Sequence, residues 1–137
     1  MRFFQRTKHK YGIAPPDERI YDDVLYDSKL EVKRAIELDL LLRSGAITGW
    51  QRQVRFELGP DFATVVDFVV TNAKTTWVEE VKGFETPDFK RIKKLWRRYG
   101  PIPLLVYTYD PKKGTKWKIQ EIPASILSSS PKSAAGE

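Results

Sequence analysis

Hydrophobic and polar residues follow two different periodicities in the middle of the chain. Between Ser28 and Gly45, apolar residues recur every three or four positions, which predicts a helix of about four turns. Ser28 and Glu31 have the spacing of a capping box, and Gly45 is typical of the position just past a helix end. From Gln51 to Leu58, apolar and polar residues alternate, which predicts a strand with one face in solvent.

A second helix and further strands complete the predicted order of elements. Residues 64–71 are apolar on both faces apart from Asp67, as in a central strand, and a short turn leads to a third strand at residues 75–82. Thr86 and Pro87 then have the positions of the N-cap and first residue of a helix. The pattern predicts an α/β fold with the order helix, three strands, helix, two strands. The last two strands are expected at residues 102–108 and 117–122.

Composition indicates one packed domain. The chain has 137 residues, of which 41% are hydrophobic and 31% charged. We expect a single domain over residues 21–127, a basic flexible arm at 1–20 and a disordered tail at 128–137. No apolar run is long enough for a membrane span or a signal peptide, so we expect a cytoplasmic protein with no membrane partner. The absence of cysteine and the presence of one histidine exclude disulfides, thiolate zinc sites and mechanisms that need two imidazoles.

Positive charge is concentrated in two segments. The net charge is +6, but residues 1–13 alone carry +4 and residues 86–100 carry +5, so the remainder is acidic. This layout is typical of a protein that contacts a phosphate backbone and also holds a cluster of carboxylates. A solvated basic helix with a basic tail is the alternative explanation. The candidate DNA contacts in these segments are Arg2, Arg6, Lys8, Lys10, Lys90, Arg91, Lys93, Lys94, Arg97 and Arg98, and a later loop adds Lys112 and Lys113.

Asp67 is the one charged residue in an apolar strand. A buried ionised carboxylate is costly unless something pairs with it, and an Arg or backbone amides can serve that purpose without any catalytic role. The next strand carries Glu80 and Lys82, which are two residues apart and therefore point to the same face of a sheet.

The register of the hairpin decides whether Asp67 shares that face. A two-residue turn after Thr71 places Glu80 diagonal to Asp67, and a four-residue turn places it directly opposite. A three-residue turn would bring Glu79 forward instead, which makes Glu79 the alternative ligand. In either of the first two registers the two carboxylates can share a divalent cation, with Lys82 beside it.

Asp67, followed thirteen residues later by Glu80-Val81-Lys82 and then by a basic helix, resembles the PD-(D/E)xK nuclease superfamily. Val66 stands where the motif has proline, a departure that the superfamily often tolerates. The resemblance covers residues 28–108 and implies a restriction-endonuclease-like core with a mixed central sheet flanked by helices. It also implies that Asp67, Glu80 and the Val81 carbonyl hold one or two Mg²⁺, with Mn²⁺ as a substitute, while Lys82 orients water or neutralises charge on the phosphorane.

More narrowly, the segments YDSKLEVKRAIELDLLL, WQRQVRFEL, DFVV and VKGFETPDFKRIKKL are similar to small phage endonucleases related to Holliday junction resolvases. In that group a glutamate on the first helix completes the metal site, and Glu31 is the match. Glu31 could instead serve only as a capping-box acid. Glu37 and Asp39, further along the helix, are expected to be solvated.

The resemblance implies a metal-dependent endonuclease that acts on four-way or other branched DNA in a bacterial or phage-infected cell. A homodimer is expected, because such junctions present two equivalent strands. A sequence-tolerant nicking, restriction-like or transposon-end nuclease is an alternative on the same site. A non-catalytic DNA-binding module, in which Asp67 and Lys82 form a buried ion pair, is an alternative of another class.

Overall fold

The structure is a computed structural model that describes residues 13–110, 112 and 117–125. The predicted tail at 128–137 and most of the predicted basic arm lie outside the described residues. The same holds for five of the predicted DNA contacts, namely Arg2, Arg6, Lys8, Lys10 and Lys113.

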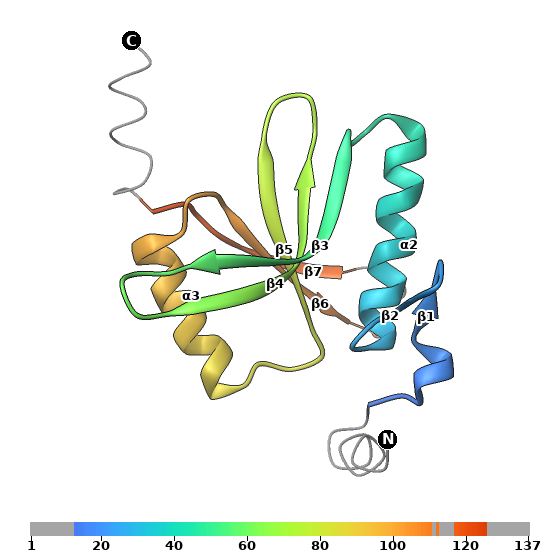
Figure 1. Cartoon of the computed structure of the whole chain (residues 1–137), viewed down its shortest axis with the longest axis horizontal. Helices are drawn as coiled ribbons and strands as arrows, with labels where there is room; N and C mark the ends of the chain where they lie inside the picture. The colour runs from blue at the N-terminus through green and yellow to red at the C-terminus, as the bar shows by residue number, and fades with distance from the viewer. Residues whose placement is uncertain (1–12, 111, 113–116, 126–137) are drawn as a thin grey trace.

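The described residues form an α/β fold with two α-helices and a five-stranded mixed sheet (Figure 1). The helices are α2 (Lys29–Ser44) and α3 (Pro87–Tyr99), and the strands of the sheet are β3 (Gly49–Glu57), β4 (Ala63–Thr71), β5 (Thr76–Lys82), β6 (Leu104–Tyr109) and β7 (Trp117–Ile122). The strand order is β3-β4-β5-β6-β7; β5 and β6 run parallel, with α3 as their crossover, and the other neighbours are antiparallel. The predicted elements are confirmed, with ends displaced by at most two residues.

Short elements precede α2. A 3₁₀ turn, η1 (Pro16–Glu18), leads into a small antiparallel pair, β1 (Ile20–Tyr21) and β2 (Val24–Leu25). Arg19 is buried among them and donates hydrogen bonds to the carbonyls of Ala14 and Tyr26, at 2.9 and 2.8 Å. Neither α-helix in the described part of the chain is long and apolar enough to cross a membrane.

The helix ends are those that the sequence predicts. The Ser28 hydroxyl accepts a hydrogen bond from the Glu31 amide at 3.1 Å, and the Thr86 hydroxyl accepts one from the Phe89 amide at 3.1 Å. Both hydroxyls thereby satisfy an amide that has no partner within its helix. Gly45 ends α2 with a φ of +86°, a left-handed conformation that glycine adopts without steric cost.

Each face of the sheet is covered by one helix and has its own hydrophobic core. Ala35 and Leu38 of α2 pack on one face, and Phe89 and Trp96 of α3 pack on the other, which Figure 1 shows as helices on opposite sides of the sheet. The central strands are therefore buried on both sides, as their apolar sequences predict. The sheet residues of the α2 core are Phe68, Val70, Val81 and Tyr107; those of the α3 core include Val66, Val78, Leu104 and Val106.

The sheet bends where β4 reaches Asp67. Phe68 belongs to the α2 core and Val66 to the α3 core, although residues two apart in a regular strand share a face. In β3, Gln53 has a φ of +56°, and the pairing of β3 with β4 skips Gln53 and Asp67. Figure 1 shows that β3 and β4 both change direction along their length. Asp67 is therefore the residue at which β4 turns from one core to the other.

The β4–β5 hairpin has the four-residue turn, one of the registers that the sequence leaves open. Thr71 pairs with Thr76, and the pairing continues to Phe68 with Glu79. Within the turn, the Asn72 side chain accepts hydrogen bonds from the two amides that follow Ala73. This register places Glu80 opposite Asp67.

A buried ion pair fixes α2 to the middle strand. Arg34 donates to both carboxylate oxygens of Glu79, at 2.7 and 3.0 Å, and Glu79 is fully buried. The same guanidinium donates to Glu37 at 2.9 Å and to the Tyr107 hydroxyl at 3.1 Å, while the Trp77 indole donates to Glu79 at 2.9 Å. Such a bidentate pair has a defined geometry and holds the helix at one height over β5.

Removal of the Glu79 charge is expected to destabilise the fold. Glu79→Gln removes the fully buried one of the two carboxylates that pair with Arg34 and leaves only the partly exposed Glu37, so the free energy of unfolding should fall by about 3 kcal/mol. Urea unfolding followed by circular dichroism measures it. The matched control is Glu57→Gln, in an exposed ion pair with Arg55, where the change should stay below about 0.5 kcal/mol. Equal stabilities of the two variants would contradict this role of Glu79.

Candidate functional site

The structure brings together the four predicted site residues at the bend of the sheet. Glu31 lies in the first turn of α2, Asp67 on β4, and Glu80 and Lys82 on β5. The three acids are only 6%, 9% and 7% exposed, in that order. Three carboxylates from three elements are thus buried in one region, where ionised groups need compensation by hydrogen bonds or by positive charge.

Asp67 and Glu80 hold the two strands together through reciprocal hydrogen bonds. The Asp67 amide donates to Oε2 of Glu80 at 2.6 Å, and the Val81 amide donates to Oδ2 of Asp67 at 2.8 Å. Backbone amides of a strand point toward the neighbouring strand, so both carboxylates lie between β4 and β5. The regular pairing ends one residue earlier, at Phe68 and Glu79, and the side chains take its place.

Lys82 supplies the positive charge beside this pair. Its Nζ lies 3.3 Å from Oε1 of Glu80 and 4.4 Å from the centre of the Phe89 ring, and its side chain is 29% exposed. Within the described residues, Lys82 therefore forms its ion pair with Glu80 and not with Asp67. The buried Asp67–Lys82 ion pair of the non-catalytic alternative is not present among the ion pairs of these residues.

Burial raises the pKa values of these acids, and repulsion between carboxylates adds to the shift for Asp67. Burial, followed by the charges of Glu80 and Glu31, raises the pKa of Asp67 to about 9, although the Val81 amide and Lys82 oppose the shift. Burial also raises the pKa of Glu80, against the opposing effect of Lys82. The region therefore has more carboxylates than its positive charge can balance.

Glu31 interacts with the helix start and with the other acids. Burial and the charges of Asp27 and Glu80 raise the pKa of Glu31 to about 7, while Arg52 and a hydrogen bond to the Asp27 backbone lower it. One half of the predicted capping box is present, because the Glu31 amide binds the Ser28 hydroxyl. The charge of Glu80 nevertheless contributes to the raised pKa of Glu31, so the two carboxylates are within electrostatic range of each other.

A groove of about 590 Å³ gives access to this region. It runs between the start of α2 and the end of β5, and one wall carries Glu31 while the other carries Val81 and Lys82. We call it the site groove. Its further lining residues are Ile13, Ala14, Asp27, Ser28, Lys29, Leu30, Gly83, Phe84 and Thr86.

The other acids considered as candidates have structural partners. Glu79, the alternative ligand, is bound by Arg34 on the opposite face of β5. The prediction that Glu37 and Asp39 are solvated is wrong. Glu37 accepts from the Trp117 indole at 2.7 Å in addition to Arg34, and Asp39 accepts from the Tyr21 hydroxyl and the Trp50 indole, at 2.6 and 3.0 Å.

Arg52 is a neighbour of the site that the sequence analysis missed. Its guanidinium carbon lies 4.4 Å from the centre of the Tyr26 ring, its charge lowers the pKa of Glu31, and its Nε is buried with no hydrogen-bond partner among the described residues. The alternation predicts only that Arg52 is partly buried, as Val54 and Phe56 are. Its neighbours were not predictable, because the break at Gln53 places Arg52 beside Tyr26 of the α2 core while Val54 and Phe56 pack on the α3 core.

The basic face of α3 is largely exposed. Lys93 differs, because its Nζ binds Glu85 at 2.8 Å and Gln120 at 3.1 Å. Lys112, beyond β6, is exposed as well. The exposed basic residues of α3 are Lys90, Arg91, Lys94, Arg97 and Arg98.

The acids do not form a complete metal cage as they stand. No group of three or more acidic or histidine side chains in residues 13–110, 112 and 117–125 has the arrangement of a ready metal site. The donor set nevertheless fits a hard divalent cation, since it consists of carboxylate oxygens and a backbone carbonyl. Comparisons with models of known protein families and with curated proteins gave no match.

The elevated pKa of Asp67 predicts that stability falls with rising pH when divalent cations are absent. The folded protein keeps a proton on Asp67 up to about pH 9, whereas the ordinary value is 3.8, so the unfolded chain releases that proton much earlier. Stability should therefore decline between about pH 4 and about pH 9.

Asp67→Asn should reduce this decline and leave the Val81 hydrogen bond intact, while Glu31 and Glu80, whose pKa values are also raised, account for what remains. In EDTA, the variant is expected to exceed the wild type in unfolding free energy by at least about 1 kcal/mol at neutral pH, the equivalent of one pKa unit. Urea unfolding over a pH series measures it, and Asp61→Asn at an exposed position is the control. Parallel pH curves for wild type and Asp67→Asn would contradict the protonation of Asp67.

Proposed function

We propose that the protein is a metal-dependent endonuclease of the Holliday junction resolvase type, which hydrolyses phosphodiester bonds in branched DNA. The observation that carries the proposal is the burial of Asp67 and Glu80 against each other beside Lys82, with Glu31 of α2 also buried and its pKa raised in part by the charge of Glu80. Burying several carboxylates is unfavourable unless a cation balances them. The PD-(D/E)xK resemblance of the same residues, within an α/β fold of matching element order, supports a restriction-endonuclease-like core.

Asp67, Glu80, Glu31 and the Val81 carbonyl would hold Mg²⁺, or Mn²⁺ in its place. When bound, the ion supplies Lewis-acid activation of the scissile phosphate and lowers the pKa of an attacking water. The reciprocal bonds to backbone amides keep Asp67 and Glu80 in fixed positions, which limits the reorganisation that binding requires. Lys82 would orient the water or neutralise charge on the phosphorane, since its partly exposed ammonium lies at the wall of the site groove.

The exposed basic residues of α3 would contact phosphates of the substrate. Such contacts carry no base information and favour the recognition of shape over sequence. A branched junction has two equivalent strands to cut, so we expect the active form to be a homodimer with two symmetrically placed sites.

Direct assay of cleavage tests the proposal. The protein with Mg²⁺ is incubated with a four-way junction, a flap and a matched duplex, and the cuts are mapped. We expect symmetric cuts near the branch point of the junction and little cleavage of the duplex.

Asp67→Asn and Glu80→Gln should each lower the cleavage rate by at least about 1,000-fold, because each removes a metal-binding charge. Lys82→Ala should also be severely slowed, even where metal still binds.

The controls separate the outcomes. Glu57→Gln, which removes an exposed carboxylate from the same sheet, should cut at the wild-type rate. Full activity of Asp67→Asn with saturating Mg²⁺ would refute the metal site. Preferential cleavage of linear duplex or of one strand would instead favour the restriction-like, nicking or transposon-end alternative.

Glu31→Gln distinguishes a metal ligand from a helix cap. Glutamine also serves at this position of a capping box, so a cap alone predicts unchanged stability and unchanged cleavage. A metal role predicts intact or higher stability, because the pKa of Glu31 is raised to about 7, together with a loss of cleavage of about 100-fold or more. Thermal unfolding and cleavage are measured on the same preparation. Wild-type turnover in the folded variant would leave Asp67 and Glu80 as the only acidic ligands.

The salt dependence of DNA affinity tests the role of α3. Lys94→Ala removes an exposed charge and should reduce the slope of log K against log salt by about 0.9, the value for one phosphate contact. Arg91→Ala and Arg98→Ala should do the same. Lys93→Ala is the control on the same helix, because Glu85 already neutralises its ammonium, so its slope should stay near that of the wild type. If Lys94→Ala, Arg91→Ala and Arg98→Ala all keep the wild-type slope, the DNA does not bind along α3.

A further inference from the structure

Phe84 is an aromatic ring exposed beside the candidate site. Its side chain is 61% exposed, and it is the one aromatic residue among the exposed large hydrophobics of the described chain. The others are aliphatic, namely Ile20, Leu25, Ile36, Leu40, Leu42, Val65 and Ile119. An exposed phenylalanine forgoes the hydrophobic stabilisation that its burial would provide.

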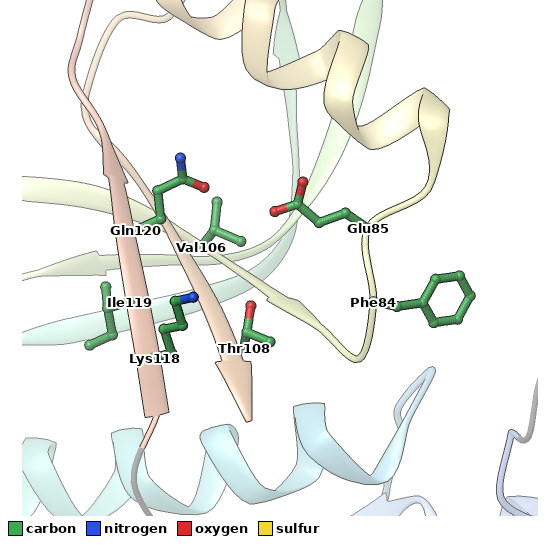
Figure 2. A pocket seen from close by; sticks show the side chains of 7 residues that line it. All are labelled: Phe84, Glu85, Val106, Thr108, Lys118, Ile119 and Gln120. Atoms are coloured by element: carbon green, nitrogen blue, oxygen red, sulfur yellow. The ribbon is translucent and has the colours of Figure 1, made fainter. Parts of the chain in front are cut away.

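The loop that carries Phe84 is fixed at both ends. Residues 83–86 connect β5 to α3; before them Lys82 binds Glu80, and after Phe84 the Glu85 carboxylate binds Lys93 at 2.8 Å. Thr86 then caps α3. In Figure 2, Glu85 points toward Gln120 while the Phe84 ring points away from the sheet. The ring is thus presented outward from an anchored loop.

Phe84 stands between two grooves. One is the site groove, and the other is a groove of about 560 Å³ lined by Glu85, Val106, Thr108, Lys118, Ile119 and Gln120 (Figure 2). Phe84 is only two residues beyond Lys82, so their Cα atoms are at most about 7 Å apart. Neighbouring bases of a strand are separated by about 3.4 Å, so a base within a few nucleotides of a phosphate held at Lys82 can reach the ring.

We infer that Phe84 stacks on an unpaired nucleobase next to the phosphate that is cleaved. The inference rests on the proposed function, and it assigns to this ring the preference for DNA with unpaired or splayed bases. A base in an intact duplex is already stacked on its neighbours and offers no free face, whereas a base at a bulge or branch point does. Stacking on an aromatic ring tolerates any base, which agrees with recognition of shape. The basic residues of α3 then hold the adjoining backbone.

The experiment compares affinities for two DNA probes that differ only in unpaired bases. One is a duplex with a three-nucleotide bulge and the other is the same duplex without it; binding is measured in EDTA, so no strand is cut. We expect Phe84→Ala to weaken binding of the bulged probe about 10-fold and of the intact duplex less than about 2-fold. Phe84→Trp should retain the preference, and Phe84→Leu should lose most of it.

Leu40→Ala, at a position with 55% exposure on α2, is the matched control and should behave as wild type. Equal affinities of Phe84→Ala and wild type for the bulged probe, or equal losses on both probes, would overturn the inference while leaving the nuclease proposal standing. A wild type that favours the bulged probe through Phe84 but never cuts DNA with Mg²⁺ would refute the nuclease proposal alone. A wild type that binds neither probe would overturn both.

Discussion

The structure of the site depends on one exchange of hydrogen bonds between β4 and β5. Where regular pairing ends, the Glu80 carboxylate accepts the Asp67 amide and the Asp67 carboxylate accepts the Val81 amide. The two acids thus replace backbone pairing at the point where β4 passes from one hydrophobic core to the other. Their burial raises both pKa values, and this electrostatic cost is what a bound cation would relieve.

The position of Glu31 follows from a second buried contact. The bidentate bond between Arg34 and Glu79 fixes α2 over the middle strand, and Glu31 lies one helical turn before Arg34. Glu79 and Glu80 are neighbours on β5, yet one serves the packing of the helix and the other belongs to the site. Opposite faces of β5 therefore carry the structural carboxylate, Glu79, and the proposed catalytic carboxylate, Glu80. The register of the β4–β5 hairpin determines which of the two lies beside Asp67.

Local sequence signals predicted most of the fold. Helix caps, the glycine after a helix and the alternation of apolar and polar residues in a strand each depend on only a few neighbouring residues. They also predicted that Asp67 and Glu80 lie close together if the β4–β5 turn has an even number of residues. Only the structure showed that this turn has four residues. The bend at Asp67 and the partners of Glu37 and Asp39 were not predictable, since they arise from contacts between elements distant in sequence. The alternating pattern indicates that Arg52 is partly buried, but not that the break at Gln53 brings it to the side of the sheet that carries Tyr26.

If these buried acids form a divalent metal site, the protein should bind Mn²⁺ without requiring any substrate. Titration followed by electron paramagnetic resonance measures free Mn²⁺ in the presence of wild type, Asp67→Asn and the exposed control Glu57→Gln. We expect wild type and Glu57→Gln to bind the ion near neutral pH with release of protons, and Asp67→Asn not to bind it. Absence of binding by the wild type, or undiminished binding by Asp67→Asn, would contradict the proposed metal site.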